Sequence, residues 1–71
     1  MTQSNWKLIY DISPYPDRTS IGKATILVRG PDERSARGSA VRTLLRHYEE
    51  EEFSFESAEG VDSDVIHLEL P

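Results

Sequence analysis

His47 and His67 are the only side chains in this sequence that ordinarily titrate near pH 7. His67, Glu69 and Glu56 could together bind a metal ion or exchange protons with a substrate. However, the sequence lacks the His-x-x-x-His and His-Glu-x-x-His spacings of zinc sites, and it has no cysteine and no Gly-x-Ser-x-Gly nucleophile motif. We therefore expect no enzymatic activity, no metal and no cofactor. A small metal-dependent or acid–base enzyme that uses His67 and Glu69 is kept as the second alternative.

Acidic side chains are the next candidate chemistry, and they are distributed unevenly along the chain. The 71 residues carry 13 acidic and eight basic side chains, which gives a net charge of −5. Residues 1–46 hold all eight basic residues against four acidic ones, or +4, whereas residues 47–71 hold nine acidic residues and no basic one, or −9. This separation of charge is the strongest compositional signal in the sequence.

An acidic run follows the predicted helix, where negative charge opposes the helix dipole and neighbouring carboxylates repel one another. Three explanations stay open: a solvated linker, adaptation to a high-salt host, or an acidic surface that binds a basic partner. In the third case, charge complementarity would steer association and set specificity. The candidate partner-binding acids are Glu49, Glu50, Glu51, Glu52, Glu56 and Glu59.

Arginines on the predicted helix are the candidate contacts for nucleic acid. Arg34, Arg42 and Arg46 could bind phosphates along one helix face. The sequence shows no recognition helix, no RNA-binding aromatic motif and no KH loop, and its net negative charge disfavours binding driven by bulk charge. We therefore expect no direct nucleic-acid binding, and keep a nucleic-acid-binding accessory protein that uses these arginines as the first alternative.

Length and composition limit the class of protein. A chain of 71 residues allows a single domain, which would span residues 1–71. The absence of cysteine excludes disulfides and suits a reducing cytoplasm. No apolar run approaches the ~18–20 residues that cross a membrane, and the polar residues 1–7 are not typical of a signal peptide. We expect a cytoplasmic protein that does not bind membranes.

Alternating apolar residues predict strands, and Pro31 with the two acids after it predicts a helix start. The predicted elements are strands over residues 6–12 and 20–29, a helix over 31–48, a strand over 51–57, a turn over 58–63 and a strand over 64–70. This β-β-α-β-β order predicts an α+β two-layer sandwich, with one helix on a four-stranded, mainly antiparallel sheet. Placing the first strand between the second and third makes all neighbours antiparallel, which predicts the strand order 2-1-3-4.

One face of this sheet should pack against the helix, and the other should be open to solvent. The predicted core residues are Trp6, Leu8, Tyr10, Ala24, Ile26, Val28, Ala40, Val41, Leu44, Leu45, Tyr48, Phe53, Phe55, Ile66 and Leu68. The apolar residues of the open face are Ile9, Leu27 and Val65. If these three cluster, they form the kind of patch that marks a protein contact, whereas scattered surface aliphatics are ordinary.

The stretch from Ala24 to Ala36, Ala-Thr-Ile-Leu-Val-Arg-Gly-Pro-Asp-Glu-Arg-Ser-Ala, joins the end of a strand to an acid-capped helix that bears alanine. This organisation resembles small proteins of phages and mobile elements. The β-β-α-β-β outline over most of the chain is similar to that of several anti-CRISPR proteins of this size. The resemblance covers organisation and no diagnostic motif, so no functional residue is carried over. It implies a single-domain protein that binds a host protein complex stoichiometrically and without a cofactor.

Together these patterns predict a small, non-enzymatic protein-binding module. We expect an inhibitor of a phage or mobile element that acts by stoichiometric binding through the acidic surface, with Ile9, Leu27 and Val65 as apolar anchors. The expected partner is a host protein or protein complex with a basic surface. An edge strand could also pair with a second copy of the chain, so monomer and homodimer both remain open.

Overall fold

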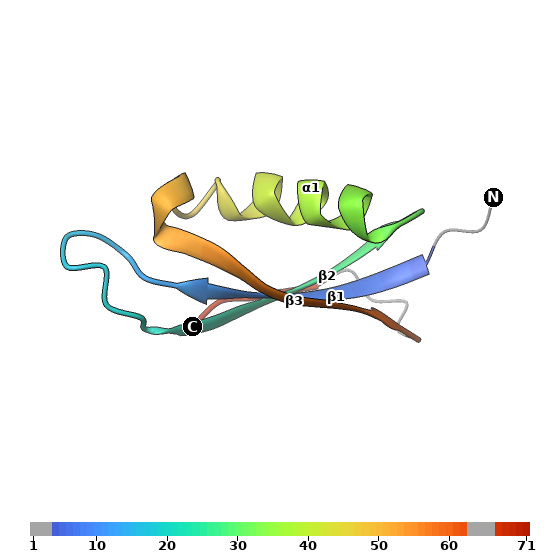
Figure 1. Cartoon of the computed structure of the whole chain (residues 1–71), viewed down its shortest axis with the longest axis horizontal. Coiled ribbons are helices and arrows are strands. Elements are labelled where there is room, and N and C mark those ends of the chain that lie inside the picture. Colours follow the sequence, from blue (N-terminus) through green and yellow to red (C-terminus); the bar gives the residue numbers. More distant parts are fainter. Residues whose placement is uncertain (1–3, 63–66) are drawn as a thin grey trace.

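The computed structural model describes residues 4–62 and 67–71, which form a sheet with one α-helix across one face (Figure 1). The elements follow in the order β1 (Ser4–Ile12), β2 (Gly22–Gly30), α1 (Glu33–Leu44), the 3-10 helix η1 (Glu50–Glu52), β3 (Phe53–Val61) and β4 (His67–Glu69). Neighbouring strands pair antiparallel in a four-stranded sheet. The predicted α+β fold is therefore confirmed.

The strand order is β3-β1-β2-β4, so β1 and β2 are central and β3 and β4 lie at the edges. The predicted position of β1 between β2 and β3 is confirmed, but the predicted neighbour of β4 is wrong. β4 pairs with β2, with Leu68 opposite Ile26 and His67 opposite Leu27. Because β2 and β3 both run antiparallel to β1, either one offers the same antiparallel partner, and alternation along a strand does not distinguish them.

The helix begins and ends inside its predicted range. Asp32 caps its first turn, since one oxygen of its carboxylate accepts a hydrogen bond from the Ser35 N–H at 2.8 Å. This hydrogen bond holds the pKa of Asp32 below its ordinary value. After Leu44 the chain closes a tight turn, in which the N–H groups of His47 and Tyr48 both donate to the Leu44 carbonyl at 2.9 Å. The predicted helix was therefore too long at its C-terminal end.

Strand β3 extends beyond its predicted end, because residues 58–61 continue the strand instead of forming a turn. Gly60, which lies within the predicted turn, is opposite Trp6 in the ladder with β1. The register shifts once along this pair, since Ser57 faces Ile9 and Phe55 faces Tyr10. The intervening residue of β3, Glu56, is thus the extra residue of a β-bulge.

The buried core joins one face of β1 and β2 to the inner face of α1. Its members are Leu8, Tyr10, Ile12, Ala24, Ile26, Ala36, Ala40 and Leu44. Predicted core residues that are only partly buried surround it, namely Trp6, Val28, Val41, Tyr48, Phe53 and Leu68. Two core predictions are wrong, because Leu45 is 50% exposed and Phe55 is 37% exposed. A further predicted core residue, Ile66, lies outside the described residues.

Glu52 separates from the rest of the acidic run, because it is buried with only 9% of its surface exposed. One carboxylate oxygen accepts a hydrogen bond from the Tyr15 N–H at 2.6 Å, and the other accepts one from the Glu49 N–H at 2.7 Å. The Glu52 carbonyl also accepts from the Ser13 N–H at 2.7 Å. These contacts tie the β1–β2 loop to η1, so the Glu52 carboxylate is engaged within the protein. Hydrogen bonding from the two backbone N–H groups lowers the pKa of Glu52.

Candidate functional site

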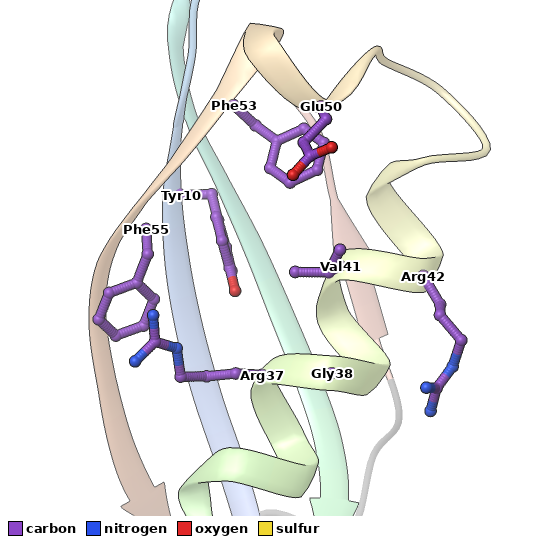
Figure 2. A pocket seen from close by; sticks show the side chains of 8 residues that line it. All are labelled: Tyr10, Arg37, Gly38, Val41, Arg42, Glu50, Phe53 and Phe55. Carbon is purple, nitrogen blue, oxygen red and sulfur yellow. The ribbon is translucent and has the colours of Figure 1, made fainter.

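A groove of about 570 Å³ lies between α1 and β3 (Figure 2). Its floor is Tyr10 of β1, and its walls come from β3 on one side and α1 on the other. The groove exists because α1 packs most closely on β2 and least on β3, which leaves the aromatic side chains at the start of β3 partly uncovered. The lining residues are Tyr10, Arg37, Gly38, Val41, Arg42, Glu50, Phe53 and Phe55.

Aromatic packing orders the β3 side of this groove. The Tyr10 ring meets the rings of Phe53 and Phe55 edge-on, with centroids 5.8 and 5.6 Å apart. The Arg37 guanidinium reaches across from α1 and lies 3.8 Å from the centroid of the Phe55 ring (Figure 2). Burial raises the pKa of Tyr10 above its ordinary value, and the neighbouring Arg37 cation partly offsets this rise. The groove therefore presents a pre-ordered aromatic wall that a partner side chain can contact.

Gly38 keeps the α1 side of the groove open. It lies within the helix, where a glycine costs about 1 kcal/mol relative to alanine. A Cβ built at Gly38 would meet only the Arg42 Nη1 atom, at 3.8 Å, so packing in the described structure does not require glycine there. The missing side chain leaves space next to Val41 that a larger residue would fill.

Glu50 lines one end of the groove, and Glu49 and Glu51 are its neighbours in the chain. Glu49, Glu50 and Glu51 are all exposed, and we call these three residues the acidic tip. Within residues 4–62 and 67–71, no Lys or Arg nitrogen lies within 4.0 Å of their carboxylates. Arg18 does reach this segment, but its guanidinium donates to the Glu51 backbone carbonyl. The negative charge of the acidic tip is consequently exposed to solvent and to any partner.

The other two predicted partner-binding acids lie on the open face of the sheet and are paired there. The Glu56 carboxylate contacts the Lys23 ammonium, and Glu59 lies 4.0 Å from the Lys7 Nζ atom. Lys23 also bridges to Asp11 at 3.4 Å. Hydrogen bonding to Glu56 raises the pKa of Lys23. Hydrogen bonds from Ser20 and Ser13 lower the pKa of Asp11. The structure thus divides the predicted acidic surface into the acidic tip and two acids of the open face that are paired with lysines but remain exposed.

The predicted apolar anchors are only partly brought together. Ile9 and Leu27 share the open face and are both half-buried, but Ile9 lies opposite Thr25 and Leu27 opposite Lys7. They are therefore diagonal neighbours, roughly 7–8 Å apart at their Cα atoms. The third predicted anchor, Val65, lies outside the described residues.

The predicted nucleic-acid residues Arg34, Arg42 and Arg46 are all exposed. Within the described residues, no acid of residues 47–71 forms an ion pair with these arginines. The only ion pair of a helix arginine in that part of the chain joins Arg37 to Glu33 at 3.8 Å, whereas Glu56 and Glu59 pair with lysines of the sheet. Within residues 4–62 and 67–71, these three arginines therefore have no carboxylate within 4.0 Å.

The candidate metal ligands are not assembled. The Nε2 atom of His67 lies 3.5 Å from a carboxylate oxygen of Glu69, while Glu56 is engaged by Lys23. In the described ranges no group of three His, Asp or Glu side chains is placed to hold a metal ion.

Comparison with known proteins adds no assignment: no family model, no curated protein and no solved structure matches this chain. None of the helices described is long and apolar enough to cross a membrane.

The groove itself was not predicted from the sequence, because Phe53 and Phe55 alternate like core residues. The one local signal was Gly38, a glycine inside a helix beside Arg37. The absence of a side chain at Gly38 leaves the groove open beside Val41.

Proposed function

We propose that this protein is a non-enzymatic binding module that attaches stoichiometrically to a protein with a basic surface. The observation that carries this proposal is the juxtaposition of the acidic tip with the aromatic groove, which Glu50 lines at one end. Protein interfaces combine an apolar, aromatic centre with a polar rim, and a few anchored side chains supply most of their affinity. The groove offers the centre, and the acidic tip offers the rim.

Charge would contribute chiefly to the rate and selectivity of this binding. The exposed carboxylates of the acidic tip would attract a basic surface from a distance and disfavour acidic competitors. Small inhibitors of phages and mobile elements, which the chain resembles in organisation, act in this stoichiometric way. We therefore include inhibition of a host protein or complex in the proposal.

Neutralising the acidic tip tests the proposal. The partner is isolated by its binding to the wild-type protein and is then purified. Near 50 mM salt, we expect the double variant Glu50→Gln/Glu51→Gln to bind this partner about fivefold more weakly than wild type does, because two exposed charge contacts are lost. The loss should shrink near 300 mM salt, where exposed charges are screened. Titration of the labelled protein at both salt concentrations measures the effect.

The matched control removes the same number of charges elsewhere, in the variant Asp62→Asn/Glu69→Gln. Both of these acids are exposed and neither lines the groove. The control should bind within twofold of wild type. Equal weakening of both variants would mean that only net charge matters, and unchanged binding of the Glu50/Glu51 variant would reject the acidic tip as the interface.

Nucleic-acid binding is the second candidate, and the specific observation in its favour is that Arg34, Arg42 and Arg46 keep their charge unneutralised in the described structure. Phosphate contacts make the logarithm of affinity fall steeply with the logarithm of salt concentration. Titrations against duplex and single-stranded DNA should therefore show such a slope, reduced in Arg42→Gln, if this candidate is correct. An absence of binding near 50 mM salt would remove it.

A further inference from the structure

The outer edge of β3 is a long stretch of strand that pairs on one side only. Within residues 4–62 and 67–71, β3 pairs with β1 and has no neighbour on its other side, where it forms the outermost strand in Figure 2. It has nine residues, whereas three residues of β4 are described at the opposite edge. Such an edge presents a row of backbone N–H and C=O groups that another strand can bind.

We propose that this edge receives an extended segment of the partner as a fifth strand of the sheet, and that apolar and basic residues alternate along this segment. The inference rests on the proposed function, because it specifies how the same partner is held. Strand addition of this kind takes its affinity from main-chain hydrogen bonds and its specificity from pockets for alternate side chains.

The two faces of β3 differ in the way that this pattern requires. Phe53, Phe55 and Ala58 face the α1 side, since they lie opposite Ile12, Tyr10 and Leu8. An added strand would direct every second side chain towards this aromatic side, where the groove opens. These side chains should be apolar.

The intervening side chains of an added strand would lie on the open face, next to two carboxylates. Glu56 and Glu59 retain 45% and 67% exposure despite their contacts with Lys23 and Lys7, so a second cation can reach each of them. β3 contains no basic residue of its own. Lysine or arginine therefore suits the intervening positions of the partner segment.

The same charges argue against a second copy of the chain as the occupant. Pairing of two β3 edges would bring Glu56 and Glu59 of each copy to one ladder with no basic residue on either strand. Like charges across a ladder are destabilising. A basic segment gains attraction from the features that repel a second copy.

The test uses a capped nine-residue peptide that alternates lysine with leucine, and a set of variants in which one backbone nitrogen at a time is methylated. Successive N–H groups of a strand point to opposite edges, so only every second methyl group would face β3. We expect methylation at alternate positions to weaken binding at least tenfold, and methylation at the positions between them to change it less than threefold. A peptide of the same composition with its lysines grouped together should also bind at least tenfold more weakly.

The other outcomes overturn either the inference or the proposed function, and they distinguish the two. Binding that ignores the position of the methyl group, but weakens in Glu50→Gln/Glu51→Gln, would leave the acidic tip as the interface and reject strand addition. An alternating methylation pattern with no response to that double variant would keep strand addition and reject the proposed role of the tip. An absence of binding at 1 mM peptide would reject the basic segment as occupant. Without peptide, protection of the β3 amides from hydrogen exchange that rises with protein concentration would also reject it, in favour of a second copy.

Discussion

Replacing Glu52 by alanine should lower the melting temperature by about 10 °C, whereas the same change at the adjacent Glu51 should lower it by less than about 2 °C. The Glu52 carboxylate accepts hydrogen bonds from the backbone of Tyr15 and of Glu49, and in the alanine variant both N–H groups would lose this acceptor. Glu51 is exposed, and its side chain makes no such bond within the described residues. Thermal unfolding followed by circular dichroism compares the two variants.

The pH dependence of this difference identifies its cause. Because the folded-state pKa of Glu52 is lowered, its stabilising effect is fully present above the unfolded-state pKa of about 4.3 and is lost as the pH falls through the lower folded-state value. The gap in melting temperature between wild type and Glu52→Ala should therefore be constant from pH 6 to 8 and shrink below about pH 4. A gap that stays constant into acid would contradict the assignment of these hydrogen bonds to the ionised carboxylate.

Filling the groove from α1 should have the largest effect on binding. Gly38→Leu places a side chain in the space beside Val41, where a Cβ meets only the end of Arg42. We expect the melting temperature to stay equal or rise, because leucine favours helix over glycine by nearly 1 kcal/mol. Affinity for the partner should fall at least thirtyfold, or about 2 kcal/mol, since an anchoring side chain could no longer enter. Parallel measurement of melting temperature and of partner affinity checks both expectations.

Gly38→Ala is the matched control for this prediction. Its single methyl group should raise the melting temperature by about 5 °C through helix propensity and change the affinity by less than threefold. If Gly38→Leu folds and binds as tightly as Gly38→Ala, the groove is not where the partner docks.

The central part of the fold could be predicted because its signals are local. Alternation along residues 6–12 and 20–29 places Leu8, Tyr10, Ala24 and Ile26 on one face, and all four are buried. The edge at which β4 pairs could not be predicted in this way, because β2 and β3 run in the same direction and offer equivalent ladders. The sequence predicts a turn over residues 58–63, although Gly60 continues β3 opposite Trp6.

In the candidate site too, features set by neighbouring residues could be predicted from the sequence, whereas features set by contacts between distant residues could not. The concentration of charge in residues 47–71 indicated the acidic tip, but it did not distinguish Glu52 from its neighbours. That distinction depends on Tyr15, which lies 37 residues away in the chain. Phe53 and Phe55 looked like core residues because the lateral position of a helix over a sheet is set by packing. Here α1 lies closer to β2, and β3 is left partly uncovered.

The most direct test of the account is the footprint of the purified partner on the isotope-labelled protein, measured by backbone amide chemical shifts. If the acidic tip and groove form the interface, the largest shifts should fall on Glu50, Phe53 and Phe55 and on the Arg37–Arg42 stretch of α1. The amides of Ile9 and Leu27 should shift little. Shifts concentrated around Ile9 and Leu27, with Glu50 and Phe55 unchanged, would contradict the account and place the interface on the open face of the sheet.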